Sequence, residues 1–138
     1  MTCCCTKRET IRTDDAPKPI GPYNAGIRAG HLIFVSGQAG IDPATGKLVE
    51  GGVEAQTRRT MTNIQNILKA AGIPMERVVK TSVFLTDMNE FAKMNAIYAE
   101  FFPNNPPART TVQVSALPKN AVVEIDAIAL ADEDCTCH

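Results

Sequence analysis

The chain has 138 residues, of which 44% are hydrophobic and 21% charged, and its 14 basic side chains nearly balance 15 acidic ones. These proportions are typical of a globular protein, and the net charge of -1 argues against a nucleic-acid-binding surface, which is usually basic. The sequence shows neither a membrane-spanning apolar stretch nor a signal-peptide pattern, so we expect a cytoplasmic protein without membrane contacts.

The five cysteines lie only in the two tails, at positions 3, 4 and 5 and at positions 135 and 137. A small disulfide-stabilised domain would carry cysteines through its body, so we exclude a disulfide framework. The tail cysteines could bind a metal together with His138, but the usual C-x-x-C spacing is absent, and dispensable tails are the simpler interpretation. We expect one domain over residues 1–138, with a core from about residue 10 to 131 and tails at 1–7 and 132–138.

The first half of the chain predicts a strand, a hairpin and a long helix. A short strand is expected over residues 8–13, and hairpin strands over 23–28 and 31–36, the second ending at the Ser36-Gly37-Gln38 sequence. Residues 53–71 carry apolar side chains at steps of three and four, which predicts a helix that Gly72 closes. Its buried face should hold Met61, Ile64, Leu68 and Ala71.

The second half predicts a strand, a helix and two further strands. A strand is expected over 78–85, and a capping box at 87–90 starts a helix through Phe101 with a buried stripe of Phe91, Met94, Tyr98 and Phe101. The strand bearing Arg109 follows, then a turn at 116–121 and a strand over 122–130. Two right-handed strand–helix–strand crossovers place both helices on one face of the sheet, so we expect an α+β fold with one face uncovered.

Alternation along the strands indicates what the uncovered face holds. If Val112 and Val114 point toward the helices, Arg109, Thr111 and Gln113 point away from them. In the last strand Glu124 belongs to the row that would lie on the open face, and in residues 78–85 the row expected to face the helices is Val79, Thr81, Val83 and Leu85. The open face would mix apolar and charged side chains, which predicts a homo-oligomer.

Arg109 and Glu124 need an explanation, because an unpaired charge within a mainly apolar strand costs several kcal/mol. The simplest explanation is a salt bridge, within one subunit or between two. Alternatively Arg109 binds a substrate carboxylate with two hydrogen bonds while Glu124 orients water or transfers a proton.

Two loop positions are further candidates for a pocket. Tyr23, in a loop rich in glycine and proline, is either a core residue or the wall of a pocket. The pair Ser36 and Gly37 either allows a small polar group to approach the backbone or simply ends a strand.

Several segments together resemble the RidA/YjgF family, which is also labelled reactive intermediate deaminase, translation inhibitor or endoribonuclease L-PSP. The resemblance covers residues 10–131, and it is carried by segments 20–23, 35–38, 80–88, 95–102, 107–109 and 117–125. It implies a chorismate mutase-like α+β fold, a mixed six-stranded sheet with two helices on one face and the final strand inserted in its middle. It also implies a homotrimer with clefts between neighbouring subunits.

The resemblance also implies an activity. Family members hydrolyse enamine and imine intermediates such as 2-aminoacrylate and 2-iminobutyrate, released by PLP-dependent dehydratases, to 2-keto acids and ammonia, without a cofactor of their own. The substrate-binding arginine of the family corresponds to Arg109 and its water-positioning glutamate to Glu124, and the pocket contacts correspond to Tyr23, Ser36 and Gly37. At Thr111 many relatives carry cysteine, so the effect of threonine there depends on whether the contact is made by the side chain or the main chain.

Two other functions remain open at this stage. One is a non-catalytic trimer that binds 2-keto acids or acts like a chaperone in the same clefts. The other is the endoribonuclease or translation inhibitor of the older family labels, against which the isoelectric point of about 6.1 and the lack of a basic and aromatic surface argue.

Overall fold

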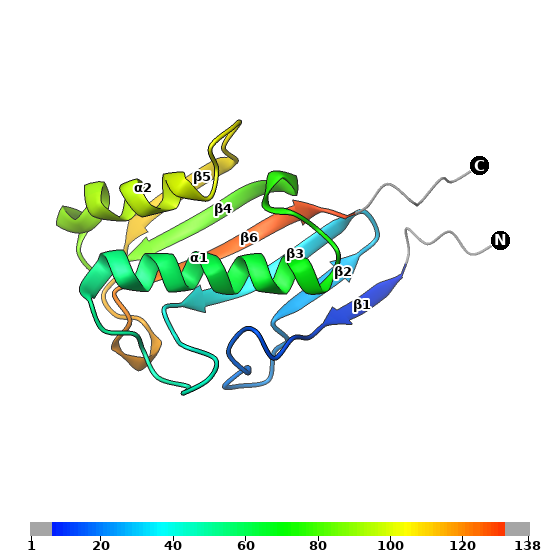
Figure 1. Cartoon of the computed structure of the whole chain (residues 1–138), viewed down its shortest axis with the longest axis horizontal. Helices are drawn as coiled ribbons and strands as arrows, with labels where there is room; N and C mark the ends of the chain where they lie inside the picture. The colour runs from blue at the N-terminus through cyan, green and yellow to red at the C-terminus, as the bar shows by residue number, and fades with distance from the viewer. Residues whose placement is uncertain (1–6, 132–138) are drawn as a thin grey trace.

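A computed structural model describes residues 7–131, which form a sheet of six strands with two helices on one of its faces (Figure 1). The elements are β1 (Arg8–Ile11), β2 (Gly26–Ala29), β3 (Leu32–Ala39), α1 (Gly52–Ala70), β4 (Val78–Leu85), α2 (Phe91–Glu100), β5 (Ala108–Gln113) and β6 (Val123–Leu130). Short 3-10 turns lie at η2 (Met75–Arg77), η3 (Met88–Glu90) and η4 (Pro118–Asn120).

The sheet has the strand order β1-β2-β3-β6-β4-β5, in which only β4 and β5 run parallel. The final strand β6 therefore lies in the middle, antiparallel to both of its neighbours. This arrangement confirms the expected α+β fold, with its mixed sheet, its inserted last strand and both helices on the same face.

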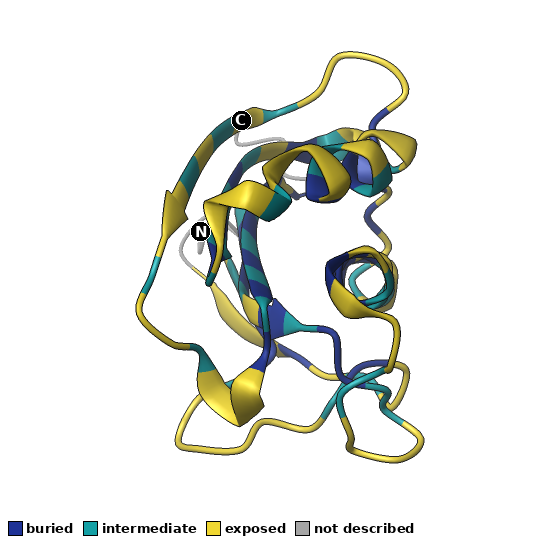
Figure 2. Cartoon of the chain, turned by 90° about the vertical axis from the view of Figure 1, so that its left-hand side faces the viewer, coloured by how far each residue is buried: buried dark blue, intermediate teal, exposed yellow. Residues whose placement is uncertain are grey.

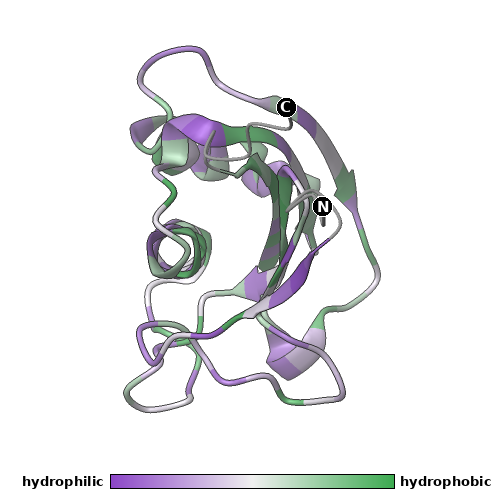
Figure 3. Ribbon diagram, turned by 90° about the vertical axis from the view of Figure 1, so that its right-hand side faces the viewer, coloured by the Kyte–Doolittle hydropathy of each residue, from purple (hydrophilic) through white to green (hydrophobic). Residues whose placement is uncertain are grey.

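Helix α1 begins and ends at glycines in left-handed backbone conformations. Gly51, the N-cap, has φ of 116°, and Gly72, just beyond the C-terminus, has φ of 76°. Met61, Ile64 and Leu68 are at most 1% exposed and pack against the sheet, as their spacing predicts. Figure 3 shows apolar residues gathered along the strands and inner helix surfaces, so the core lies between these two layers.

The middle strand follows the predicted alternation closely. Val123, Ile125, Ala127 and Ala129 are at most 2% exposed and face the helices, whereas Glu124 and Asp126 lie on the open face and are half-buried. Figure 2 shows the same alternation of buried and intermediate residues along the central strands.

Two sequence predictions differ from the structure where strand pairing is irregular. β3 does not end at Gly37 but continues to Ala39 through a shift in its pairing with β6 between Val35 and Gln38. A similar shift between Val78 and Lys80 buries Val78 and leaves Val79 40% exposed, so the prediction that Val79 faces the helices was wrong. A bulge of this kind reverses alternation locally, which a strict period of two cannot anticipate.

The predicted stripe of α2 also needs correction at its two ends. Met94 and Tyr98 are buried, but Phe91 is 37% exposed and Phe102 is buried in place of Phe101. Asp87 does act as a cap, since its carboxylate accepts a 2.9 Å hydrogen bond from the Asn89 N–H, but it caps η3 ahead of α2. The helix therefore starts one turn later than the capping box suggested.

The orientation of β5 was predicted wrongly. In its parallel pairing with β4, Arg109 lies beside Thr81 and Thr111 beside Val83, both buried residues of the helix face. Val112 is paired with Phe84 on the open face and is 39% exposed. Because β5 is an edge strand at the rim of the core, a long charged side chain can run along the helix layer and end near solvent.

Within residues 7–131 no helix is long and apolar enough to cross a membrane, and no cluster of three potential metal-binding side chains occurs. The tail cysteines, for which metal binding was the alternative to dispensable tails, lie outside the described residues.

Candidate functional site

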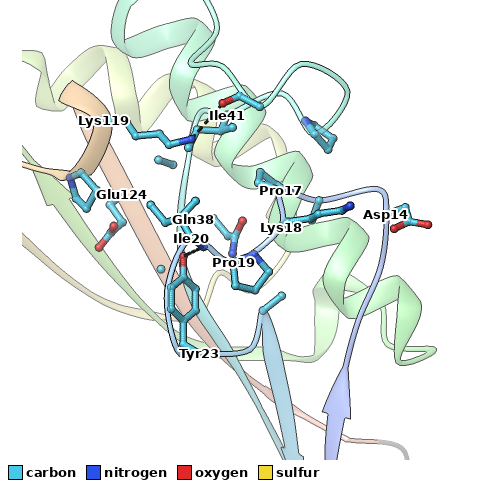
Figure 4. Close-up of a pocket in the computed structure, with 17 residues that line it drawn as sticks. Asp14, Pro17, Lys18, Pro19, Ile20, Tyr23, Gln38, Ile41, Lys119 and Glu124 are labelled. Atoms are coloured by element: carbon cyan, nitrogen blue, oxygen red, sulfur yellow. Dashed lines mark hydrogen bonds between the residues drawn. The ribbon is translucent and has the colours of Figure 1, made fainter.

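A cavity of about 620 Å³ lies where the loop before β2, the far end of β3 and the turn before β6 meet (Figure 4). Tyr23, Gly37 and Glu124 all line it, so the structure brings together three of the six predicted site residues. Its other walls include Pro19, Ile20, Gln38, Ile41 and Lys119. The volume is ample for a ligand of a few heavy atoms beside the glutamate.

Gly37 and Glu124 form the closest contact in the wall of this cavity. A Cβ built on Gly37 would lie 2.8 Å from Oε2 and 2.9 Å from Cδ of Glu124, closer than real Cβ contacts allow. The irregular pairing between Val35 and Gln38 places Gly37 beneath the carboxyl group. Only glycine lets the Glu124 side chain lie flat against β3 in this position.

Tyr23 forms part of the cavity wall and does not belong to the core. Its ring is 44% exposed, and its hydroxyl oxygen accepts a 3.2 Å hydrogen bond from the backbone N–H of Ile20. The Tyr23 N–H in turn donates to the Gly21 carbonyl at 2.8 Å. These two bonds shape the loop so that the tyrosine ring lies beside Ile20 and Gln38 (Figure 4).

Ser36 has a different position from the one expected. Its hydroxyl donates a 2.6 Å hydrogen bond to the Asn24 carbonyl, and its N–H donates to the Ala25 carbonyl at 2.9 Å. The side chain is not among the residues that line the cavity. Through these two bonds, Ser36 attaches the loop containing Tyr23 to strand β3.

The Glu124 carboxyl is poised to hold a proton more tightly than an ordinary glutamate. Burial raises its pKa, and the negative charge of Asp126, two residues along the same face, raises it further. Asp126 itself accepts a 3.1 Å hydrogen bond from the Ser82 N–H. A carboxyl group beside a cavity, with its pKa raised above the ordinary glutamate value, is better suited to donate a proton to a bound ligand.

Arg109 lies on the other face of the sheet, against helix α2. Its guanidinium carbon is 4.8 Å from the ring centre of Tyr98 and 5.5 Å from that of Phe91. No carboxylate among residues 7–131 pairs with it. Stacking on aromatic rings leaves the N–H groups of the guanidinium available for an anionic ligand.

Arg109 and Glu124 therefore do not meet within one chain. Arg109 shares the helix face with Thr81, whereas Glu124 lies opposite, paired with Phe84 on the open face. The strand β4 also lies between the two strands that carry them. This geometry excludes a salt bridge between them inside one subunit and overturns the prediction that both lie on the open face. Thr111, on the same face as Arg109, is likewise outside the cavity.

Gln38 and Lys119 are among the polar residues that line the cavity and that the sequence did not single out as site residues. Gln38, 6% exposed, donates from Nε2 to the Ser36 carbonyl at 3.3 Å. Lys119 has a left-handed backbone with φ of 58° and donates from Nζ to the Gly46 carbonyl at 3.2 Å. The segment 117–119 was noticed only for its family resemblance, and the position of Lys119 depends on a tight turn that periodicity does not describe.

Fold and site together define a small α+β protein in which an arginine and a glutamate, both without an ion-pair partner among residues 7–131, lie on opposite faces of one sheet. The sequence model of the family described as Endoribonuclease L-PSP matches residues 13–131. The chain belongs to this family, which includes the YjgF and Rid proteins.

Named relatives show how far the similarity extends. A RutC family protein of Pyrococcus horikoshii is 52% identical over 88% of this chain and 97% of its own length. The mouse protein named 2-iminobutanoate/2-iminopropanoate deaminase is 46% identical over 89% of this chain and 91% of its own. The crystal structure of Escherichia coli TdcF with bound serine superposes with a TM-score of 0.86 at 39% identity, covering 90% of this chain and 99% of that one.

Proposed function

We propose that this protein is a homotrimeric deaminase that hydrolyses 2-aminoacrylate, 2-iminobutyrate and related enamines or imines to 2-keto acids and ammonia. The observation that carries the proposal is that one fold holds both an arginine stacked on aromatic rings, with no carboxylate partner among residues 7–131, and a cavity-lining glutamate with a raised pKa. These substrates carry one carboxylate for the arginine and one electrophilic carbon for water. The mouse relative with the corresponding name supports the choice of substrate class.

The opposite placement of Arg109 and Glu124 supports a site built from two subunits. The open face of the sheet exposes large apolar side chains, including Phe34 at 42%, Val112 at 39% and Leu130 at 38%, next to partly buried Phe84 and Ile128. Such a face favours self-association. Packing of these faces would bring the edge strand β5 of one subunit toward the Glu124 cavity of its neighbour.

The chemistry then needs no metal or nucleophilic side chain. Arg109 would bind the substrate carboxylate with two N–H groups and fix the imine carbon in the cavity. Protonated Glu124 would donate its proton to the imine nitrogen, and the resulting carboxylate would accept a proton from the attacking water. In the carbinolamine that forms, Glu124 returns its proton to nitrogen as the C–N bond breaks, and the resulting carboxylate accepts the hydroxyl proton as the C=O bond forms, which releases ammonia and the 2-keto acid.

A non-catalytic ligand-binding protein is the second candidate, because the similar crystal structure of Escherichia coli TdcF contains bound serine. Binding of a keto acid without turnover would use the same arginine and cavity. The endoribonuclease of the older family description is less favoured, because the isoelectric point of about 6.1 gives no general attraction to RNA.

The direct experiment couples a threonine dehydratase to this protein and follows the release of 2-oxobutanoate against a control without the protein. Wild type should accelerate release, and Arg109→Ala and Glu124→Gln should each reduce the acceleration by about a hundredfold or more. Saturable binding of 2-oxobutanoate with no acceleration would favour the ligand-binding protein. Absence of both would rule out the proposed substrate class.

Mixing the two inactive variants tests whether each site draws on two subunits. After joint unfolding and refolding of equal amounts, random assembly would create intact Arg109 and Glu124 pairs at about a quarter of the sites. Activity should therefore recover to about a quarter of wild type. If each subunit held a complete site, mixing would restore nothing.

A further inference from the structure

The Arg109 side chain lies in an aromatic cradle, which we define as the rings of Phe91 and Tyr98 on α2. The guanidinium carbon is 5.5 Å from the first ring centre and 4.8 Å from the second, within the range of cation–π contacts. Phe91 is 37% exposed and Tyr98 is 5% exposed, so the cradle is open at one side and buried at the other. The guanidinium is thus held at the boundary between core and solvent.

Tyr98 is itself held firmly by its hydroxyl group. This hydroxyl lies 2.7 Å from Oγ1 of Thr81, a residue with no exposed surface. Thr81 is also the partner of Arg109 in the parallel pairing of β4 and β5. Thr81 therefore contacts both residues: it hydrogen-bonds the Tyr98 hydroxyl and is the strand neighbour of Arg109, so its position on β4 fixes the ring relative to the arginine.

The Arg109 guanidinium can contact a partner either through its N–H edge or through its flat face. A carboxylate partner would occupy the N–H groups at its edge, whereas an aromatic ring contacts its flat face and occupies none of them. No ion pair among residues 7–131 involves Arg109, so its flat face is engaged and its edge is not paired with a carboxylate. The guanidinium also interacts with the Tyr98 hydroxyl: burial raises the Tyr98 pKa, and the hydrogen bond to Thr81 together with the charge and hydrogen bond of Arg109 lowers it by less than that rise.

We propose that Tyr98 is a positioning residue for carboxylate binding, because it fixes the Arg109 guanidinium while the remaining N–H groups, which have no carboxylate partner among residues 7–131, can bind the ligand. Phe91 covers the outer side of the same group and contributes less. The inference rests on the proposed function, since it assumes that Arg109 binds the carboxylate of a 2-keto or 2-imino acid.

If Tyr98 served only to pack the core, replacing its buried neighbour Phe102 should affect ligand binding as much as replacing Tyr98. Tyr98 also packs on Phe102, with ring centres 5.0 Å apart, and Phe102 is 7% exposed. Phe102 makes no cation–π contact with Arg109, whose ring partners are Phe91 and Tyr98. Phe102→Leu therefore serves as a matched control that loses buried aromatic area without touching the arginine.

The experiment measures the Kd of 2-oxobutanoate by titration calorimetry, together with KM and kcat for imine hydrolysis, on full-length variants. Tyr98→Leu should raise Kd and KM about tenfold with kcat nearly unchanged, because carboxylate binding is shared by the ground and transition states. Tyr98→Phe, which keeps the ring, should stay within about threefold of wild type. Phe102→Leu should lower the unfolding temperature while Kd remains at the wild-type value.

A double-mutant cycle and a surface variant complete the test. In an Arg109→Ala background, adding Tyr98→Leu should lower kcat/KM no further, because Tyr98 acts through the arginine. If Tyr98→Leu does not fold, Phe91→Leu on the exposed side should still raise Kd about threefold.

The outcomes separate this inference from the proposed function. Equal Kd and KM values for Tyr98→Leu and Phe102→Leu, in a wild type that binds and turns over, would overturn the positioning role alone. If Tyr98→Leu does not fold, a Phe91→Leu variant with the wild-type Kd would overturn it in the same way. A wild type that neither binds 2-oxobutanoate nor accelerates hydrolysis would overturn the proposed function and this inference with it.

Discussion

Gly37 lies directly beneath the Glu124 carboxyl group, so close that a methyl group on Gly37 would be 2.8 Å from Oε2. The two residues belong to neighbouring antiparallel strands, and the irregular pairing of β3 brings the backbone of Gly37 under the side chain. The absence of a side chain at position 37 thus determines where the acid group of the candidate site can lie.

Gly37→Ala should therefore displace the Glu124 carboxyl while leaving the fold intact. The clash is with the end of a flexible side chain, which can rotate away, so we expect a stability loss of no more than about 1 to 2 kcal/mol. Hydrolysis of the imine should fall about tenfold or more in kcat/KM. The matched control is Gly21→Ala, whose Cβ would meet Tyr23 at an ordinary 3.5 Å. Wild-type activity in Gly37→Ala would show that the carboxyl position is not critical.

Glu124→Gln should stabilise the protein in a pH-dependent way. Burial and the charge of Asp126 raise the pKa of Glu124, so the folded chain holds this proton more tightly than the unfolded chain does. Stability from this group is then present below the ordinary glutamate pKa and is lost as the pH rises through the raised value. Thermal unfolding should give Glu124→Gln a higher Tm than wild type at about pH 8 and little difference at about pH 4. A constant difference at both values would contradict the raised pKa.

How far the sequence predicts this molecule depends on where each residue lies in the sheet. Around Ile125 alternation is reliable, because an inner strand with one face against the helices must bury every second residue. At Arg109 the same rule failed, because an edge strand leaves Val112 exposed at little cost and allows the arginine stem to lie along α2. In β5 the residues alternate between the two faces as predicted, but each lies on the face opposite to the predicted one.

The site was less predictable than the fold. Tyr23, Gly37 and Glu124 were identified from their residue types and the family resemblance, and they do share one cavity. The close approach of Gly37 to Glu124 depends on a bulge in β3, which has no distinct signal in the sequence. Lys119 reaches the cavity through two successive left-handed residues in η4, an unusual backbone for lysine that composition does not reveal.

Asp126→Asn should shift the pH dependence of catalysis without removing any group from the cavity. The asparagine keeps an oxygen for the Ser82 N–H but loses the charge that raises the pKa of Glu124. If Glu124 donates a proton, activity declines as it ionises, so the decline of kcat/KM at high pH should begin at a lower pH in the variant. Glu76→Gln, which removes an acidic charge from η2, should leave the profile in place. An unchanged pH profile in Asp126→Asn would show that Glu124 does not donate the proton in the rate-determining step.

The open face of the sheet offers the clearest test of assembly. Phe34 is 42% exposed and is paired with Ile27 on one side and Ile128 on the other, so it lies in the middle of an apolar surface. Phe34→Glu would place a charge there, and burying it between subunits would cost several kcal/mol. Light scattering should then report a monomer mass with an unchanged circular dichroism spectrum, and imine hydrolysis should be lost because Arg109 and Glu124 of one chain lie on opposite faces. Phe34→Leu, which keeps the surface apolar, should retain both the wild-type mass and activity. A monomeric Phe34→Glu variant with full activity would mean that one subunit suffices for catalysis.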